Sequence, residues 1–169
     1  LALAHGRRVV PVTTLDALAW IAAGGKEAPP RLAAWLDAQR QEVFAALYAP
    51  AEADEPRRLT EPTVGAPAAI LEAWRERLAS VDCRFAGDGA LRYREVIAAA
   101  LGPRAAVVDP LPPLAAAVAE LAAGRAARGQ AVAPHAIVPL YVRRPDAELA
   151  RERAPGAPDR TPAPGAAAG

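Results

Sequence analysis

The segment RLAAWLDAQRQEVFAALYA, from Arg31 to Ala49, carries the clearest secondary-structure pattern of this chain. Its two arms, Leu32–Asp37 and Glu42–Tyr48, alternate their side chains with the period of two that is typical of β-strands. The connection from Ala38 to Gln41 is short and polar, as antiparallel neighbours require. A helix could also be drawn through this alanine-rich stretch, but the apolar–aromatic pairs of the second arm and the polar cluster between the arms favour strands. We therefore predict an antiparallel hairpin in a sheet that helices cover.

Upstream of the hairpin, the pattern predicts a strand followed by a helix. The segment RVVPV, residues 8–12, is rich in β-branched residues, which is typical of a short buried strand. Thr13 or Thr14 can cap the next helix, and Asp16 suits its positive end. The double glycine at 24–25 ends the helix. Its buried face is expected to consist of Leu15, Leu18, Ala19 and Ala22.

Downstream of the hairpin, short strands and helices alternate, which favours an α/β fold. Strands are expected at Leu59–Val64, Cys83–Ala86 and Ala105–Val108, and helices at Pro67–Ala79, after the GDGA turn and from Pro112 onward. Prolines bound PLYVRR, residues 139–144, which should therefore be extended. The last 16 residues contain four prolines and three glycines, and a disordered tail or linker is expected from Ala154 to Gly169.

The composition argues against nucleic-acid binding through charge alone. The chain has 169 residues, of which 53% are hydrophobic, enough for a core. It carries 20 basic and 19 acidic residues, so its net charge of +1 gives no field that would steer it onto a polyanion. All the basic residues except Lys26 are arginines, which indicates a composition bias. No apolar run reaches the length of a membrane span.

The residues that could bind metal or act as nucleophiles are few. Cys83 is the single cysteine, so an intramolecular disulfide and a thiolate cluster are both excluded. His5 and His135 are too far apart in sequence to indicate a zinc site. A Cys–His nucleophile pair is formally possible, but Cys83 lies in the apolar run VDCRFAG, where a buried inert thiol is expected. We predict no catalytic residue and no metal.

The GDG sequence of Gly87, Asp88 and Gly89 is the candidate ligand loop. Backbone amides at a helix start can accept a phosphate or an adenosine moiety. However, the dinucleotide fingerprint and the P-loop pattern are both absent. The favoured interpretation is structural: Gly87 and Gly89 make a tight turn and Asp88 caps the helix. On this interpretation the chain has no cofactor.

Two further groups of charged residues are candidates for chemistry. Asp37 and Glu42 could form a carboxylate pair for acid–base or metal chemistry, but both flank a surface turn, and a turn-stabilising Asp37 is favoured. Arg143 and Arg144 could contact phosphate, although adjacent arginines at a strand end are usually a solvated edge.

Taken in order, the motifs LALA, VVPVTTLDALA, WLDAQRQEVFAALY, GDGA and PLYVR resemble the TsaB (YeaZ) family from Leu1 to about Pro145. The chain departs from the family pattern at Gln39, where arginine is common, and at Gln41, where glycine is usual. These departures concern the geometry of the hairpin turn. The family's segments that grip its partner subunit would lie upstream of Leu1, so the resemblance predicts an N-terminally truncated member.

The resemblance implies a ribonuclease-H-like, actin-like ATPase (ASKHA) fold of two lobes, of which the first is incomplete in this chain. Residues 1–25 would end the N-terminal lobe, residues 26–110 would form the C-terminal lobe, and residues 111–153 would return to the first as a helix and a strand. Residues 154–169 would form the disordered tail.

The function that the resemblance implies is that of a non-enzymatic scaffold. The family supports TsaD, which transfers the threonylcarbamoyl group to adenosine 37 of ANN-decoding tRNAs, and the ATPase TsaE completes the bacterial complex. A cytoplasmic protein is expected, with tRNA contacted only through the complex and a homodimer possible. The alternative is a catalytic, nucleotide-binding member of the actin-like kinase superfamily that uses GDG for adenosine.

Overall fold

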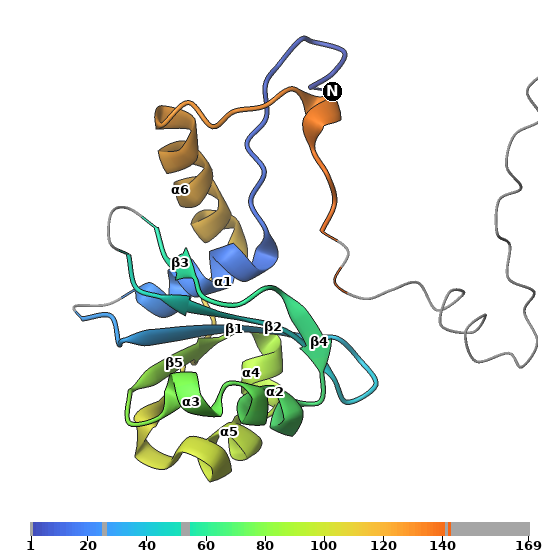
Figure 1. The fold of residues 1–169 in the computed structure, drawn as a ribbon. Helices are drawn as coiled ribbons and strands as arrows, with labels where there is room; N and C mark the ends of the chain where they lie inside the picture. Colours follow the sequence, from blue (N-terminus) through green and yellow to red (C-terminus); the bar gives the residue numbers. More distant parts are fainter. Residues whose placement is uncertain (1, 25–26, 52–54, 141, 143–169) are drawn as a thin grey trace, which may run out of the picture.

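The computed structural model of the chain describes residues 2–24, 27–51, 55–140 and 142. A mixed sheet lies between two layers of helices (Figure 1). Its strands are β1 (Arg31–Asp37), β2 (Val43–Ala49), β3 (Arg57–Arg58), β4 (Thr63–Gly65), β5 (Cys83–Ala86) and β6 (Ala105–Val107). They are ordered β3-β2-β1-β5-β6, and β4 also pairs with β2.

Helices cover both faces of the sheet (Figure 1). Helix α1 (Thr14–Ala23) packs on one face, and α6 (Leu114–Ala127) packs against α1. The opposite face carries α2 (Pro67–Ala73), α3 (Arg75–Leu78), α4 (Asp88–Arg92) and α5 (Arg94–Leu101). The predicted α/β class is therefore confirmed.

The predicted hairpin is confirmed. Strands β1 and β2 pair in antiparallel register, with Leu32 opposite Tyr48 and Asp37 opposite Val43. On its other side β1 pairs in parallel with β5, and β5 pairs in parallel with β6. Strand β1 thus lies inside the sheet and is hydrogen-bonded along both edges.

Alternating side chains of β1 point into two separate cores. Ala33 and Trp35 face the side of α2–α5, where Trp35 meets the Phe85 ring edge-on at 5.3 Å between centroids. Leu32 and Ala34 face α1. All four predicted core residues of α1 (Leu15, Leu18, Ala19 and Ala22) are buried, as is Ala17. The period of two in the sequence therefore corresponds to two apolar faces, which is why the strand needs a helix layer on each side.

The strand predicted at residues 8–12 is wrong. Within the described residues, this segment forms an isolated bridge between Val9 and Val132 instead of a strand. Pro11 has no N–H group to donate to a ladder, and the Arg8 guanidinium bonds the Ala131 carbonyl. The β-branched composition predicts an extended backbone, but a strand also needs a neighbouring strand to pair with, and composition does not show whether one is present.

Two other predicted elements differ in the structure. The strand predicted at Leu59–Val64 is confirmed only at its end, in β4, and is wrong at residues 59–62, which connect β3 to β4 and where the Leu59 amide bonds the Leu47 carbonyl at 2.8 Å. The helix predicted at Pro67–Ala79 is interrupted at Trp74, which separates α2 from α3. The strands at Cys83–Ala86 and Ala105–Val107 are as predicted, apart from one residue at an end.

The C-terminal part is described in part. Helix α6 begins at Leu114, close to the predicted start at Pro112. Pro139 and Leu140 belong to no regular element. Arg143, Arg144 and the predicted tail at 154–169 lie outside the described residues. No helix among the described residues is long and apolar enough to cross a membrane.

The turn between β1 and β2 has an unusual backbone. Gln39, Arg40 and Gln41 have φ values of 61°, 52° and 62°, in the left-handed region. The turn is closed by hydrogen bonds from the Ala38 amide to the Glu42 carbonyl, 3.0 Å, and from the Glu42 amide to the Gln39 carbonyl, 2.9 Å. Side chains with a Cβ atom are strained in this region by about 1–2 kcal/mol per residue.

We predict that Gln41→Gly stabilises the protein by about 0.5–1 kcal/mol, because relief of the strain exceeds the entropy cost of glycine. Gln41→Ala is the matched control, since it removes the side chain but keeps the strained backbone, and it should give no gain. Urea unfolding of the three proteins measures the difference. Equal stabilisation by Ala and Gly would show that the Gln41 side chain, and not its φ angle, is unfavourable.

Candidate functional site

The GDG loop joins β5 to α4 and presses against the end of β1. Gly87 has a φ of 125°, and a Cβ atom there would lie 1.9 Å from the Trp35 carbonyl oxygen. A Cβ atom on Gly89 would lie 2.8 Å from the Leu36 carbonyl carbon. Both glycines are therefore required for the close approach of two backbones, in agreement with the structural interpretation of the loop.

Asp88 connects this loop to β1. Its Oδ1 atom accepts hydrogen bonds from the Asp37 amide at 3.0 Å and from the Gly89 amide at 2.8 Å. The predicted capping role is wrong by one position, because Gly87 occupies the N-cap and Asp88 is the first helical residue. The carboxylate still accepts an amide of the first turn, and it also ties α4 to the end of β1.

Asp37 is the second candidate residue of this corner. The Arg92 guanidinium donates to its Oδ2 atom at 2.6 Å, and the Gln39 amide donates to its Oδ1 atom at 3.1 Å. Asp37 therefore stabilises the turn, as predicted, and its ionic partner is Arg92 of α4. Glu42 closes the turn through its backbone amide and carbonyl, and its pairing with Asp37 stays a hypothesis.

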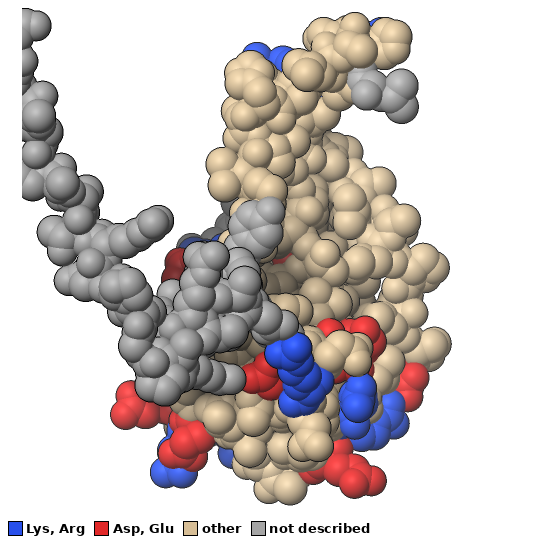
Figure 2. All heavy atoms as spheres, turned by 90° about the vertical axis from the view of Figure 1, so that its right-hand side faces the viewer, with Lys and Arg blue, Asp and Glu red and all other residues tan. Residues whose placement is uncertain are grey.

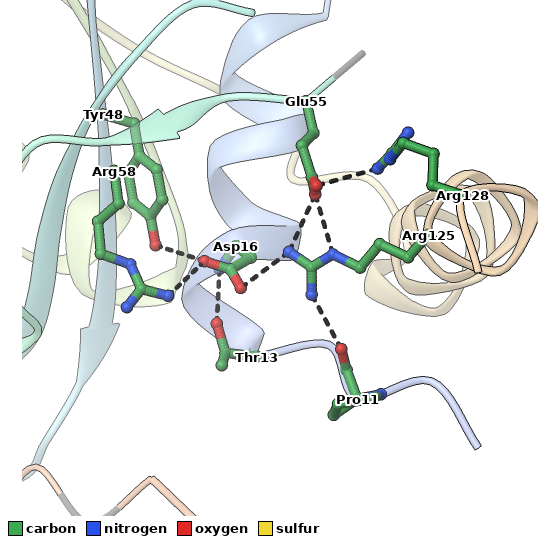
Figure 3. A network of polar contacts seen from close by, with 8 residues as sticks. All are labelled: Pro11, Thr13, Asp16, Tyr48, Glu55, Arg58, Arg125 and Arg128. Carbon is green, nitrogen blue, oxygen red and sulfur yellow. Dashed lines mark hydrogen bonds and ion pairs between the residues drawn. The ribbon is translucent and has the colours of Figure 1, made fainter. Parts of the chain in front are cut away.

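A larger polar network surrounds Asp16, near the start of α1 (Figure 3). Its Oδ1 atom accepts from the Tyr48 hydroxyl at 3.0 Å and from Arg58 at 2.9 Å. Its Oδ2 atom accepts from Arg125 at 3.2 Å. The Asp16 amide donates to the Thr13 hydroxyl oxygen at 3.1 Å, which makes Thr13 the N-cap. One carboxylate thus joins α1, β2, β3 and α6.

Arg125 extends this network (Figure 3). Its Nε atom donates to Glu55 at 2.9 Å, and another nitrogen donates to the Pro11 carbonyl at 2.9 Å. Arg128 donates to the second oxygen of Glu55 at 3.0 Å. The Arg125 side chain is 18% exposed and that of Asp16 is 13% exposed, so this ion pair is largely removed from solvent.

The network sets the ionisation of its members. Burial by itself raises the pKa of Asp16, but hydrogen bonds from Arg58, Thr13 and Tyr48 and the charge of Arg58 outweigh it and hold the pKa below its usual value. Burial and the neighbouring Asp16 charge raise the pKa of Tyr48. Asp16 is therefore an anion at neutral pH, and Tyr48 is a neutral donor to it.

The sequence does not reveal this network. Asp16 suits the positive end of a helix, a role that needs no partner. Arg125 lies 109 residues away from Asp16, and no local spacing relates the two.

The candidate groups for metal and nucleophilic chemistry, Cys83, His5 and His135, lie on different segments of the structure. Cys83 is buried, and burial raises the pKa of its thiol to about 12, so the thiol is protonated at neutral pH. No group of three or more potential metal ligands occurs among the described residues. His5 and His135 lie in the N-terminal turn region and in the short helix at 134–136.

An apolar groove of about 570 Å³ lies where α1 begins and β1 ends. Its walls are residues 11–15 and the segment Ile137–Leu140 with Val142, and Leu36 and Phe44 of the hairpin also line it. Val138 is 85% exposed. In Figure 2, charged side chains gather over the lower part of the molecule, while the upper part shows few.

No protein-family model and no curated protein matches this chain. Solved structures do match it. A crystal structure from Pseudomonas aeruginosa, of a protein similar to peptidase YeaZ, superposes with a TM-score of 0.64 at 29% identity, covering 84% of this chain and 62% of that one. YeaZ from Pseudomonas aeruginosa superposes with a TM-score of 0.63 at 28% identity, covering 83% of this chain and 62% of that one.

These similarities define the class of the protein as a mixed α/β protein with a YeaZ-like fold. The predicted resemblance to the TsaB (YeaZ) family is thereby confirmed. The chain spans 62% of the length of each of these structures. The ribonuclease-H-like, actin-like assignment is consistent with the mixed sheet, and the division into lobes at residues 25 and 110 stays a prediction.

We predict that Gly87→Ala destabilises the protein by at least about 3 kcal/mol, because its Cβ atom would overlap the backbone of β1. Gly102→Ala is the matched control: Gly102 also has a positive φ, 58°, but no atom lies within 4 Å of the added Cβ. Its backbone strain alone should cost about 1–3 kcal/mol, and Gly87→Ala should cost more because it adds the overlap with β1. Denaturant unfolding compares the two, and equal costs would contradict the close approach at Gly87.

We predict that Asp16→Asn lowers the stability by about 1–3 kcal/mol at neutral pH. The folded pKa of Asp16 is depressed, so the stabilisation by its charge is complete above the unfolded pKa of about 4 and is lost as pH falls through the lower folded pKa. The difference in unfolding free energy between wild type and variant should therefore become smaller below about pH 4. Glu72→Gln, which removes an exposed carboxylate bonded to Arg75, should change stability by less than about 0.5 kcal/mol. A difference in unfolding free energy that stays constant with pH would contradict a lowered pKa of Asp16 in the folded protein.

Proposed function

We propose that the protein is a non-catalytic scaffold subunit that supports TsaD in threonylcarbamoyl transfer to adenosine 37 of ANN-decoding tRNAs. The observation that carries the proposal is the similarity to YeaZ over more than four-fifths of this chain. TsaE would complete the complex, and tRNA would be contacted through TsaD. The role implies a cytoplasmic protein that needs no cofactor of its own.

The polar groups support a scaffold more than an enzyme. Asp37 is paired with Arg92, and Asp16 with Arg58 and Arg125, so these charges hold elements of the fold together. A catalytic group needs at least one free contact to a substrate. The alternative kinase-like function would need the GDG loop to receive adenosine, but its glycines are packed against β1.

Reconstituted threonylcarbamoyl transfer tests the proposal. The reaction contains TsaD, TsaE, ATP, threonylcarbamoyl donor and an ANN-decoding tRNA, with or without the complete product of the gene that encodes this chain. We expect modification to fall at least tenfold when that protein is left out. YeaZ from Pseudomonas aeruginosa serves as the positive control, and heat-unfolded protein as the negative control.

Binding to TsaD alone, measured by calorimetry, separates a scaffold from an enzyme that acts on its own. The proposal requires a stoichiometric complex. Full activity of TsaD and TsaE without the protein would overturn it, as would the absence of binding to TsaD.

A further inference from the structure

Arg84 is a charged residue in an otherwise apolar strand. It lies on β5 between Cys83 and Phe85, which are both buried. In the pairing of β5 with β1, Arg84 is opposite Leu32, a residue of the core on the side of α1. Paired residues of neighbouring strands share a face of the sheet, so the Arg84 side chain also extends toward α1. A guanidinium partly withdrawn from water in this way needs hydrogen-bond acceptors.

The acceptors of Arg84 are three backbone carbonyls around the end of α1. Its Nη1 atom donates to the carbonyl of Ala22 at 2.9 Å and to that of Gly24 at 2.7 Å. Its Nη2 atom donates to the carbonyl of Glu27 at 3.1 Å. Ala22 lies in the last turn of α1, Gly24 is the C-cap, and Glu27 precedes β1. One side chain of β5 therefore joins the end of α1 to the connection that leads into β1.

The end of α1 needs a cation that the helix itself does not carry. The last carbonyls of a helix have no intrahelical donors, and the helix dipole places partial negative charge there. The last turn of α1 contains no basic residue. Ala22 and Ala23 still pack against the core, whereas Gly24 and Glu27 are exposed. Arg84 therefore supplies both the positive charge and the hydrogen bonds at the point where the apolar packing of α1 ends.

We propose that Arg84 is a clamp that keeps the end of α1 and the start of β1 in a fixed relative position on the sheet. The predicted boundary between the two lobes, at residues 25 and 26, falls between Gly24 and Glu27, which both bond to Arg84. Hinge bending at this boundary would break these hydrogen bonds, so the clamp opposes it. The clamp is a property of this fold and does not depend on the proposed function.

Amide exchange, followed residue by residue by NMR, tests the clamp on the whole chain. Arg84→Gln should speed exchange of the amides from Ile21 to Gly24 by about tenfold or more, because the last turn of α1 loses its partners. The amides of β2 report global unfolding and should be unchanged relative to wild type. Arg104→Gln is the matched control, since Arg104 also donates to a carbonyl at a helix end, that of Leu78, at 2.7 Å. It should leave the end of α1 unchanged.

Arg84→Lys separates the charge of the clamp from its geometry. A lysine keeps a positive charge near the end of α1, but its ammonium group lacks the planar fork that reaches carbonyls on both sides of the guanidinium. It should therefore restore only part of the protection that Arg84→Gln loses. Full protection in the lysine variant would overturn the clamp, because charge alone would then be sufficient. Unchanged exchange at the end of α1 in Arg84→Gln would overturn it too, as would equal acceleration in α1 and β2.

A measurement on the wild-type protein does not require Arg84 to be changed. Hydrogen bonds on both Nη atoms should hinder rotation of the guanidinium, so that Nη1 and Nη2 give separate NMR signals. Arg77, whose side chain is exposed, is the internal reference and should give one averaged signal at the same temperature. Rotation of the Arg84 guanidinium as fast as that of Arg77 would overturn the proposal.

Discussion

The structure depends on the central position of β1, whose backbone is bonded on both edges and approached closely at its end. Its side chains alternate between two cores, so α1 must lie on one face and α2–α5 on the other. At the C-terminal end of β1, the GDG loop lies so close that Gly87 and Gly89 cannot carry side chains. Added Cβ atoms there would meet the backbone carbonyls of Trp35 and Leu36. The order of strands, the two helix layers and the position of α4 all follow from this arrangement.

The parts of the fold that could be predicted are those that local pattern determines. The period of two in Leu32–Asp37 was sufficient for the hairpin, and the cap and apolar face of α1 were readable from a few adjacent residues. The segment at 8–12 has the same β-branched composition as a strand, yet pairing depends on a neighbour that composition does not reveal. The pair of glycines indicates a turn, but only the folded structure shows that a Cβ atom at Gly87 would meet the Trp35 carbonyl.

The Asp16 network shows why the candidate site was harder to predict than the fold. Its members come from four elements, and in a sequence with many arginines nothing distinguishes Arg58 or Arg125 from those on the surface. Their role is fixed by burial, since a carboxylate that is withdrawn from water needs charged and hydrogen-bonding partners to remain ionised. The sequence shows only that Asp16 is an acidic residue in a first helical turn. Its partners Arg58 and Arg125 become evident only in the folded structure.

A YeaZ-like fold does not by itself assign a function, because function resides in sites and surfaces. Here Asp16 and Asp37 are paired with arginines of the same chain, and these pairs hold elements of the fold together. The apolar groove and the Asp16 network meet at Pro11, which lines the groove and accepts a hydrogen bond from Arg125. A molecule that binds in the groove against Pro11 would therefore meet a segment whose position Arg125 fixes through the Pro11 carbonyl. The buried ion pair between Arg125 and Asp16 would in that case help to hold one wall of the groove in place.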